Sequence, residues 1–118
     1  MTVEYDYPLP NVNTVTLAGK VPKAPGLTYR TDGVAVLRFL VGVEDHNEKL
    51  NKTFNTVVPC EITGASAERI GAELDAGDTV LIRGKLAYRS TAEQSGGSLG
   101  VWAQLVQKLN ARAMSAAS

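Results

Sequence analysis

Two short strand-like segments, each with a glycine near its middle, constrain the fold of this chain more than any other feature. Residues 13–21 alternate apolar and polar side chains around Gly19, and residues 79–88 do the same around Gly84. A glycine inside a strand indicates a sharp bend or the close approach of another backbone. Small closed barrels need such bends, so the pair predicts a barrel rather than an open sheet.

Three further strands are predicted between and after this pair. An apolar run broken by Arg38 follows the hairpin signal Thr31-Asp32-Gly33, and Pro59 near the end of the next run indicates a sheet edge or a bulge. The expected strands cover residues 12–21, 34–43, 52–60, 79–88 and 99–109. A turn is expected at Pro25-Gly26, a polar loop over 45–51 and a Ser/Gly loop over 90–100.

One short helix is predicted between the third and fourth strands. Ile70 and Leu74 form an apolar stripe, Ser66 is the expected N-cap, and Gly77 is expected to end the helix in a left-handed conformation. The order of elements favours an all-β, five-stranded Greek-key barrel. The domain is expected to cover 12–109, after an extended arm at 1–11 and before a disordered tail at 110–118.

Composition limits the classes of function. The 12 basic and 12 acidic residues give no net charge, so any attraction to a polyanion must come from their placement. Cys60 is the only cysteine, which excludes an intrachain disulfide and a cysteine-rich metal site. Neither a signal-peptide pattern nor an apolar run near the ~20 residues of a membrane span is found, so a cytoplasmic protein without membrane contact is expected.

The sequence offers little for catalysis. Cys60 and His46 are a formal nucleophilic pair, but a buried strand cysteine and a loop histidine are the favoured interpretation. The acidic residues around His46 follow one another in a polar loop and lack metal-ligand spacing. No glycine motif that would cradle a phosphate is present. We therefore expect no enzyme, no cofactor and no metal.

Four segments in order resemble the bacterial single-stranded DNA-binding protein family, which has the OB-fold. They are residues 13–21, 29–39, 66–78 and 80–89, and the resemblance covers about 12–109. It implies an OB-fold barrel that binds single-stranded DNA without sequence preference, in DNA replication, recombination or repair. It also implies a homo-oligomer, a dimer or tetramer, that pairs through the first strand.

The sequence departs from this family in two respects. Phe54 is the one matched stacking position that keeps an aromatic, whereas His46, Cys60 and Thr91 stand near positions where the family has aromatics. Residues 110–118 hold no acidic residue, so the acidic tail that recruits replication and repair proteins in the family is missing from this sequence. The resemblance therefore implies a tail-less, aromatic-poor member, whose replication or repair partners would have to bind without that tail.

Candidate binding residues are aromatics for base stacking and cations for phosphate contact. Trp102 alternates with Val101 and is expected on the outer face; Tyr88 is a weaker candidate that also fits an exposed strand end. For Phe54, surface stacking and core burial remain equally open. Arg38 is expected to face a groove rather than a subunit interface. The other cations, for which a solvated strand face is equally open, are Lys20, Lys49, Lys52, Arg83, Lys85 and Arg89.

Two alternative functions stay open. One is an accessory factor similar to the primosomal replication protein, which fits the loss of aromatics and tail. The other is a protein-interaction OB domain without nucleic-acid binding, which the absence of net charge supports. Salt dependence separates them, because binding to phosphates weakens as ionic strength rises.

Overall fold

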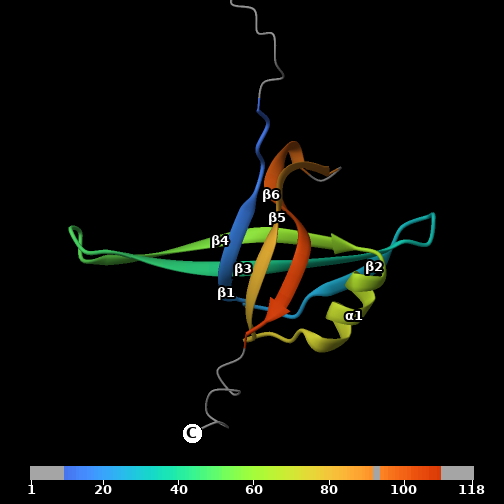
Figure 1. Ribbon diagram of the computed structural model, residues 1–118, viewed down its shortest axis with the longest axis horizontal. Helices are drawn as coiled ribbons and strands as arrows, with labels where there is room; N and C mark the ends of the chain where they lie inside the picture. The colour runs from blue at the N-terminus through green and yellow to red at the C-terminus, as the bar shows by residue number, and fades with distance from the viewer. Residues whose placement is uncertain (1–9, 92–93, 110–118) are drawn as a thin grey trace, which may run out of the picture.

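The structure, a computed structural model, describes residues 10–91 and 94–109, with the side chains of 89–91 and 94–97 outside the description. The elements described are β1 (Val15–Lys20), β2 (Gly26–Tyr29), β3 (Ala35–Asn47), β4 (Lys52–Thr63), α1 (Ala65–Glu73), β5 (Thr79–Thr91) and β6 (Gln94–Lys108) (Figure 1). The tail expected at 110–118 and most of the arm expected at 1–11 lie outside the described residues.

The strands form one sheet that closes on itself. Its order is β1-β5-β6-β4-β3-β2, and β1 also pairs with β3 through Lys20 and Gly42, which completes the ring. Strands β4 and β6 are parallel, and every other pair is antiparallel. The barrel consists of β1, β3, β4, β5 and β6, while the four-residue β2 adds to the edge of β3. The predicted five-stranded barrel with one helix is confirmed.

Both strand glycines stand where two backbones come too close for a side chain. A Cβ placed on Gly19 would collide with the carbonyl oxygen of Gly42, at the point where β1 meets β3. A Cβ on Gly84 would collide with the carbonyl oxygen of Trp102, where the β5–β6 register shifts by a bulge. The close approach predicted from the sequence is confirmed at both positions.

The core fills the barrel and continues under the helix. Helix α1 packs mainly on β3, with further contacts to β2 and β4, and places Ile70 against the barrel interior. Leu74, at the helix C-cap, is also buried. The largest fully buried side chains are Leu37, Ile82, Val21, Val36, Val41, Val80, Val101 and Cys60. The apolar stripe expected for the helix is confirmed.

The helix ends differ from the prediction. Gly64 is the N-cap, with a φ of 85°, and the helix begins directly after it, so Ser66 lies inside α1 and its predicted capping role is wrong. At the other end the chain leaves the helix in extended conformation at Leu74. Gly77 does adopt a left-handed φ of 92°, but it does so in the next turn, where the Asp78 amide donates to the Asp75 carbonyl.

Strands β3 and β4 run further than predicted. Residues 45–47 continue β3, so the predicted loop over 45–51 shrinks to residues 48–51. The turn is held by the Leu50 amide, which donates to the Asn47 side chain at 3.1 Å, and by Asn51 at a φ of 48°. The two strands form a long hairpin that projects beyond the barrel, at the left of Figure 1.

Other loop predictions also need correction. The turn expected at Pro25-Gly26 is wrong, because Gly26 is the first residue of β2 and pairs with Arg38 of β3. Residues 31–33 do form the predicted turn between β2 and β3. Every described residue of 90–100 lies in β5 or β6, so the predicted Ser/Gly loop is wrong for these residues. Pro59 has a strand partner only on β3, since the β6 pairing starts at Cys60, which agrees with the predicted edge. Among the described residues, no helix is long and apolar enough to cross a membrane.

Candidate nucleic-acid interface

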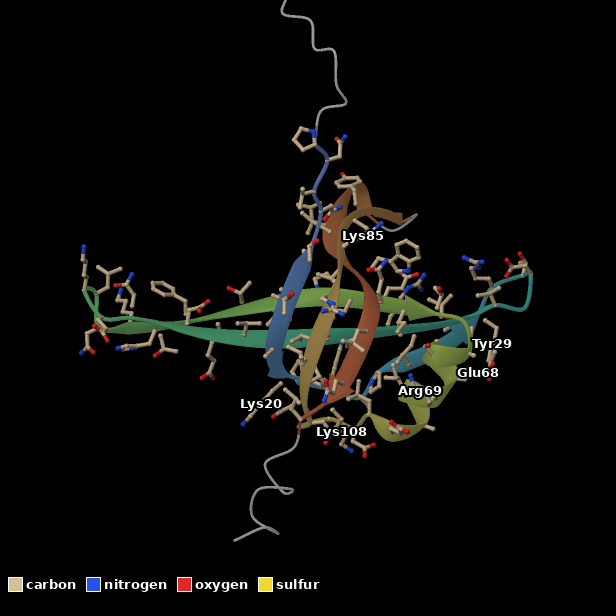
Figure 2. The ribbon with its side chains drawn as sticks, in the orientation of Figure 1. Lys20, Tyr29, Glu68, Arg69, Lys85 and Lys108 are labelled. Atoms are coloured by element: carbon tan, nitrogen blue, oxygen red, sulfur yellow. The ribbon has the colours of Figure 1, made fainter. Side chains whose placement is uncertain are left out.

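A row of polar and aromatic side chains crosses the outer face of four strands. The register places Lys85 of β5 opposite Trp102 of β6, Trp102 beside Glu61 of β4, and Glu61 opposite Arg38 of β3. Because directly paired residues share a face of the sheet, these four side chains point the same way, out of the barrel. Figure 2 labels Lys85, the member of this row that β5 contributes.

Trp102 is the aromatic centre of this row. Its neighbours Val101 and Ala103 are 2% and 3% exposed, whereas Trp102 is 46% exposed. Successive side chains of a strand point to opposite faces of the sheet, so Trp102 points outward when both of its neighbours point into the core. The expected outer position of Trp102 is confirmed. A half-exposed indole on a sheet offers its ring to a planar ligand at little cost in side-chain entropy.

Beside Trp102 lies a pocket of about 250 Å³, which we name the tryptophan pocket. It is lined by Arg30, Glu61, Thr63, Ala87, Val101 and Trp102. Arg30 reaches it from the turn between β2 and β3, and its guanidinium holds Asp32 through contacts of 2.9 and 3.3 Å. Asp32 in turn accepts from the Val34 amide at 3.1 Å. The pair with Asp32 thus orients the exposed Arg30 side chain at the turn beside the pocket.

The ion pair between Arg30 and Asp32 shifts the pKa of both side chains. The hydrogen bond to Asp32 and the charge of Asp32 raise the pKa of Arg30, and the charge of Glu61 acts in the same direction. The hydrogen bond from Arg30, together with that from the Val34 amide, lowers the pKa of Asp32. Arg30 was not predicted as a binding residue. The sequence feature that could have indicated it is the presence of Asp32 two residues later, at a predicted turn.

A second pocket, of about 390 Å³, lies on the same face next to β2. It is lined by Lys23, Ala24, Gly26, Arg38, Phe39, Leu40, Pro59 and Cys60. Arg38 is 56% exposed and lies 3.7 Å from the Glu61 carboxylate, so it stands between the two pockets. The expectation that Arg38 faces a groove agrees with this position. Lys23, which the sequence did not single out, adds a second cation.

Phe54, Lys49 and Lys52 lie away from this row, on the projecting hairpin and its turn. Phe54 is 47% exposed, so the core-burial interpretation is wrong. It pairs with Asp45 on the side of the hairpin that continues the core face of the barrel, beyond the point where the barrel can bury it. Phe54 and Glu61 are seven positions apart along β4, roughly 23 Å at the usual rise of a strand.

The remaining candidates are spread over other surfaces. Tyr88 is 65% exposed and pairs with Leu99, on the face opposite to that of Trp102. Arg83 is exposed between Thr16 and Leu105, across the bulge from Lys85. Lys20 lies at the β1–β3 closure, well apart from Lys85 in Figure 2. The Arg89 side chain lies outside the described residues.

The geometry does not support nucleophilic or metal chemistry at the residues considered. Cys60 is fully buried opposite Phe39, whereas His46 is paired with Thr53 on the exposed hairpin. The two are thus separated by roughly 23 Å of strand. Within residues 10–91 and 94–109, no group of three or more His, Cys, Asp or Glu side chains could hold a metal ion.

Comparison with known proteins decides the family. The model of the Single-strand binding protein family matches residues 12–112. The chain belongs to this family. Members are binding proteins and not enzymes, which confirms the non-enzymatic expectation. The single-stranded DNA-binding protein of Borreliella burgdorferi is 27% identical over 92 residues, which cover 74% of this chain and 60% of that protein. The present chain thus spans less than two thirds of that relative.

Solved structures of this family share the fold. The wild-type single-stranded DNA-binding protein from Thermus aquaticus matches with a TM-score of 0.76 at 22% identity. A deletion variant of the same protein matches with a TM-score of 0.73 at 23% identity. Both matches cover 86% of this chain and 52% of the other. The OB-fold expected from the sequence is confirmed.

Proposed function

We propose that this single-strand binding family member binds single-stranded DNA across the outer face of β3, β4, β6 and β5, in replication, recombination or repair. The observation that carries the proposal is half-exposed Trp102, which shares the row with the cations Lys85 and Arg38 and the tryptophan pocket with Arg30. Stacking on an aromatic and phosphate contacts along a basic groove are what sequence-tolerant binding of a single strand requires. A cytoplasmic site of action, with replication or repair proteins as partners, belongs to the same proposal.

Titration with oligothymidine tests this directly. Trp102 is the only tryptophan, so its fluorescence reports on the row itself. Binding is expected to quench it and to weaken with salt, with a slope near 0.7 for each phosphate contact on a single strand. Absence of binding even at low salt would contradict the proposal and favour a protein-interaction domain.

The salt dependence of binding, measured in lysine variants, shows which lysines contact phosphate. Lys85→Gln is expected to lower the salt slope by about 0.7, because one contact in the row is lost. Lys108→Gln is the matched control: Lys108 lies at the far end of β6, where it contacts Asp78 at 3.3 Å and donates to the Glu73 carbonyl. An equal change in both variants would argue against the row as the binding surface.

We also propose that the chain forms a homo-oligomer through β1. All six residues of β1 pair with β5, but on its other side the pairing with β3 is confined to Lys20 and Gly42. Among the described residues, 15–18 thus have a ladder partner on β5 alone, which leaves a strand edge that favours pairing with another copy. Linked binding sites would compensate for a small groove with few aromatics.

Light scattering tests the oligomer. The native chain is expected at a multiple of 12.5 kDa, and Thr16→Lys should shift it toward the monomer, because edge lysines oppose strand pairing. The same lysine at Thr53, on the projecting hairpin, should leave the mass unchanged. A native chain that runs at 12.5 kDa over the whole concentration range would refute the pairing.

A further inference from the structure

The tryptophan pocket contains a carboxylate, which is unexpected on a surface that should attract phosphates. Glu61 lies in the middle of the row, between Trp102 and Arg38, with its side chain 23% exposed. A negative charge there opposes the electrostatic attraction on which backbone binding depends. Glu61 already pairs with Arg38 across the strands, and a carboxylate has the capacity to contact, in addition, a part of the ligand other than phosphate.

We propose that the tryptophan pocket binds one base of the strand and that Glu61 selects bases with an exocyclic amino group, guanine above all. This inference rests on the proposed binding of single-stranded DNA and adds a preference at one position of the strand. Glu61 is then a specificity-determining residue within an otherwise sequence-tolerant surface.

The chemistry of the pocket assigns separate tasks to its side chains. Stacking tolerates every base because every base has a π-face, so Trp102 supplies affinity but not choice. Choice requires contacts to the edge of the base. Guanine offers two adjacent N–H donors at N1 and N2, which match the two oxygens of a carboxylate, and its O6 and N7 acceptors suit an arginine such as Arg30. Thymine has two carbonyl oxygens on either side of its single N–H, and a carboxylate repels them.

The geometry suits one base. Pockets for drug-sized ligands measure about 300–1,000 Å³, so an open pocket of about 250 Å³ fits a single planar ring system. Asp32 holds Arg30 in place on one side, and Arg38 lies 3.7 Å from Glu61 on the other. A carboxylate can accept about four hydrogen bonds, so its ion pair with Arg38 is compatible with contact to a base. Both charged groups line the same pocket and each has an ion-pair partner beside it.

Three oligonucleotides test the inference. Each is a short oligothymidine whose central position carries dT, dG or deoxyinosine, the last being guanine without its 2-amino group. We expect the dG strand to bind about fivefold tighter than the dT strand, which is the low end for one bidentate base contact. Deoxyinosine should lose most of that gain. Glu61→Gln should abolish the preference for dG over dT, because the carboxylate that accepts from N1 and N2 of guanine is removed.

Glu44→Gln is the matched control. Glu44 is an exposed carboxylate on the same outer face of β3, but it pairs with Asn55 near the projecting hairpin and does not line the tryptophan pocket. It should keep the preference for dG. Equal affinity of the native chain for all three strands would overturn the inference and leave the proposed function intact, as would an unchanged preference in Glu61→Gln. No binding of any strand at low salt would overturn both.

Discussion

Gly84→Ala is expected to lower the free energy of unfolding by about 3 kcal/mol, the upper part of the usual range for overpacking. The added Cβ would collide with the Trp102 carbonyl oxygen and lie 2.8 Å from the Cα of Ala103. Both neighbours are backbone atoms of β6, so no side-chain rotation relieves the contact. The strand pair must open instead, at the bulge that bends β5 around the barrel.

Gly26→Ala is the control for this experiment. Gly26 also lies in a strand, but a Cβ there meets no atom within 4 Å, and its φ is not in the left-handed region. Its effect should stay within about 0.5 kcal/mol, because alanine also restricts the unfolded chain. Urea unfolding of both variants measures the difference. Similar stabilities would show that the β5–β6 crossing is looser than the structure indicates.

The barrel could be predicted because its determinants are local. Gly19 and Gly84 lie where two backbones cross too closely for a side chain. In the strands around them, every second side chain tends to be apolar and buried, and this pattern is visible in the sequence. The ends of elements were less predictable. Gly64, with its positive φ, is the residue at which the chain enters α1. Ser66 is a residue type that often caps helices, but here it lies inside the helix.

The projecting hairpin illustrates a different limit. Residues 44–49 are polar, and polarity between two apolar runs usually indicates a loop. A hairpin that extends beyond the barrel is solvated on both faces, so its strands carry the composition of a loop. The hydrogen bonds of the ladder, and not burial, then stabilise the extension. The same reason explains how Phe54 can lie on the core side of β4 and still be exposed.

The candidate site could be predicted only in part. The outer position of Trp102 follows from the burial of its two neighbours, which alternation along one strand reveals. Its proximity to Glu61 follows from parallel pairing between β4 and β6, strands that are distant in the sequence. Register between such strands depends on how the whole barrel closes. Glu61 and Arg30 were therefore missed, and Tyr88 was grouped with Trp102 although it lies on the opposite face of the sheet.

Trp102→Ala is expected to weaken binding of oligothymidine about 5- to 150-fold, which corresponds to the ~1–3 kcal/mol of one base–aromatic stack. The substitution removes the only tryptophan, so the measurement uses the anisotropy of a labelled strand. Because the side chain is half-exposed between two buried neighbours, its removal should leave the barrel folded, which thermal unfolding checks. Trp102→Phe retains an aromatic face and should recover part of the affinity.

Phe54→Ala and Tyr88→Ala provide the comparison that makes this result specific. Both side chains are exposed aromatics, but one lies on the projecting hairpin and the other on the opposite face of the β5–β6 hairpin. A strand that follows the row from Lys85 to Arg38 would miss both, so each substitution should weaken binding less than Trp102→Ala. If Phe54→Ala has the largest effect, the binding path runs along the projecting hairpin and the tryptophan pocket is peripheral to it. A comparable loss in Phe54→Ala and Trp102→Ala would instead indicate a strand long enough to contact both surfaces, since roughly 23 Å of β4 separates them.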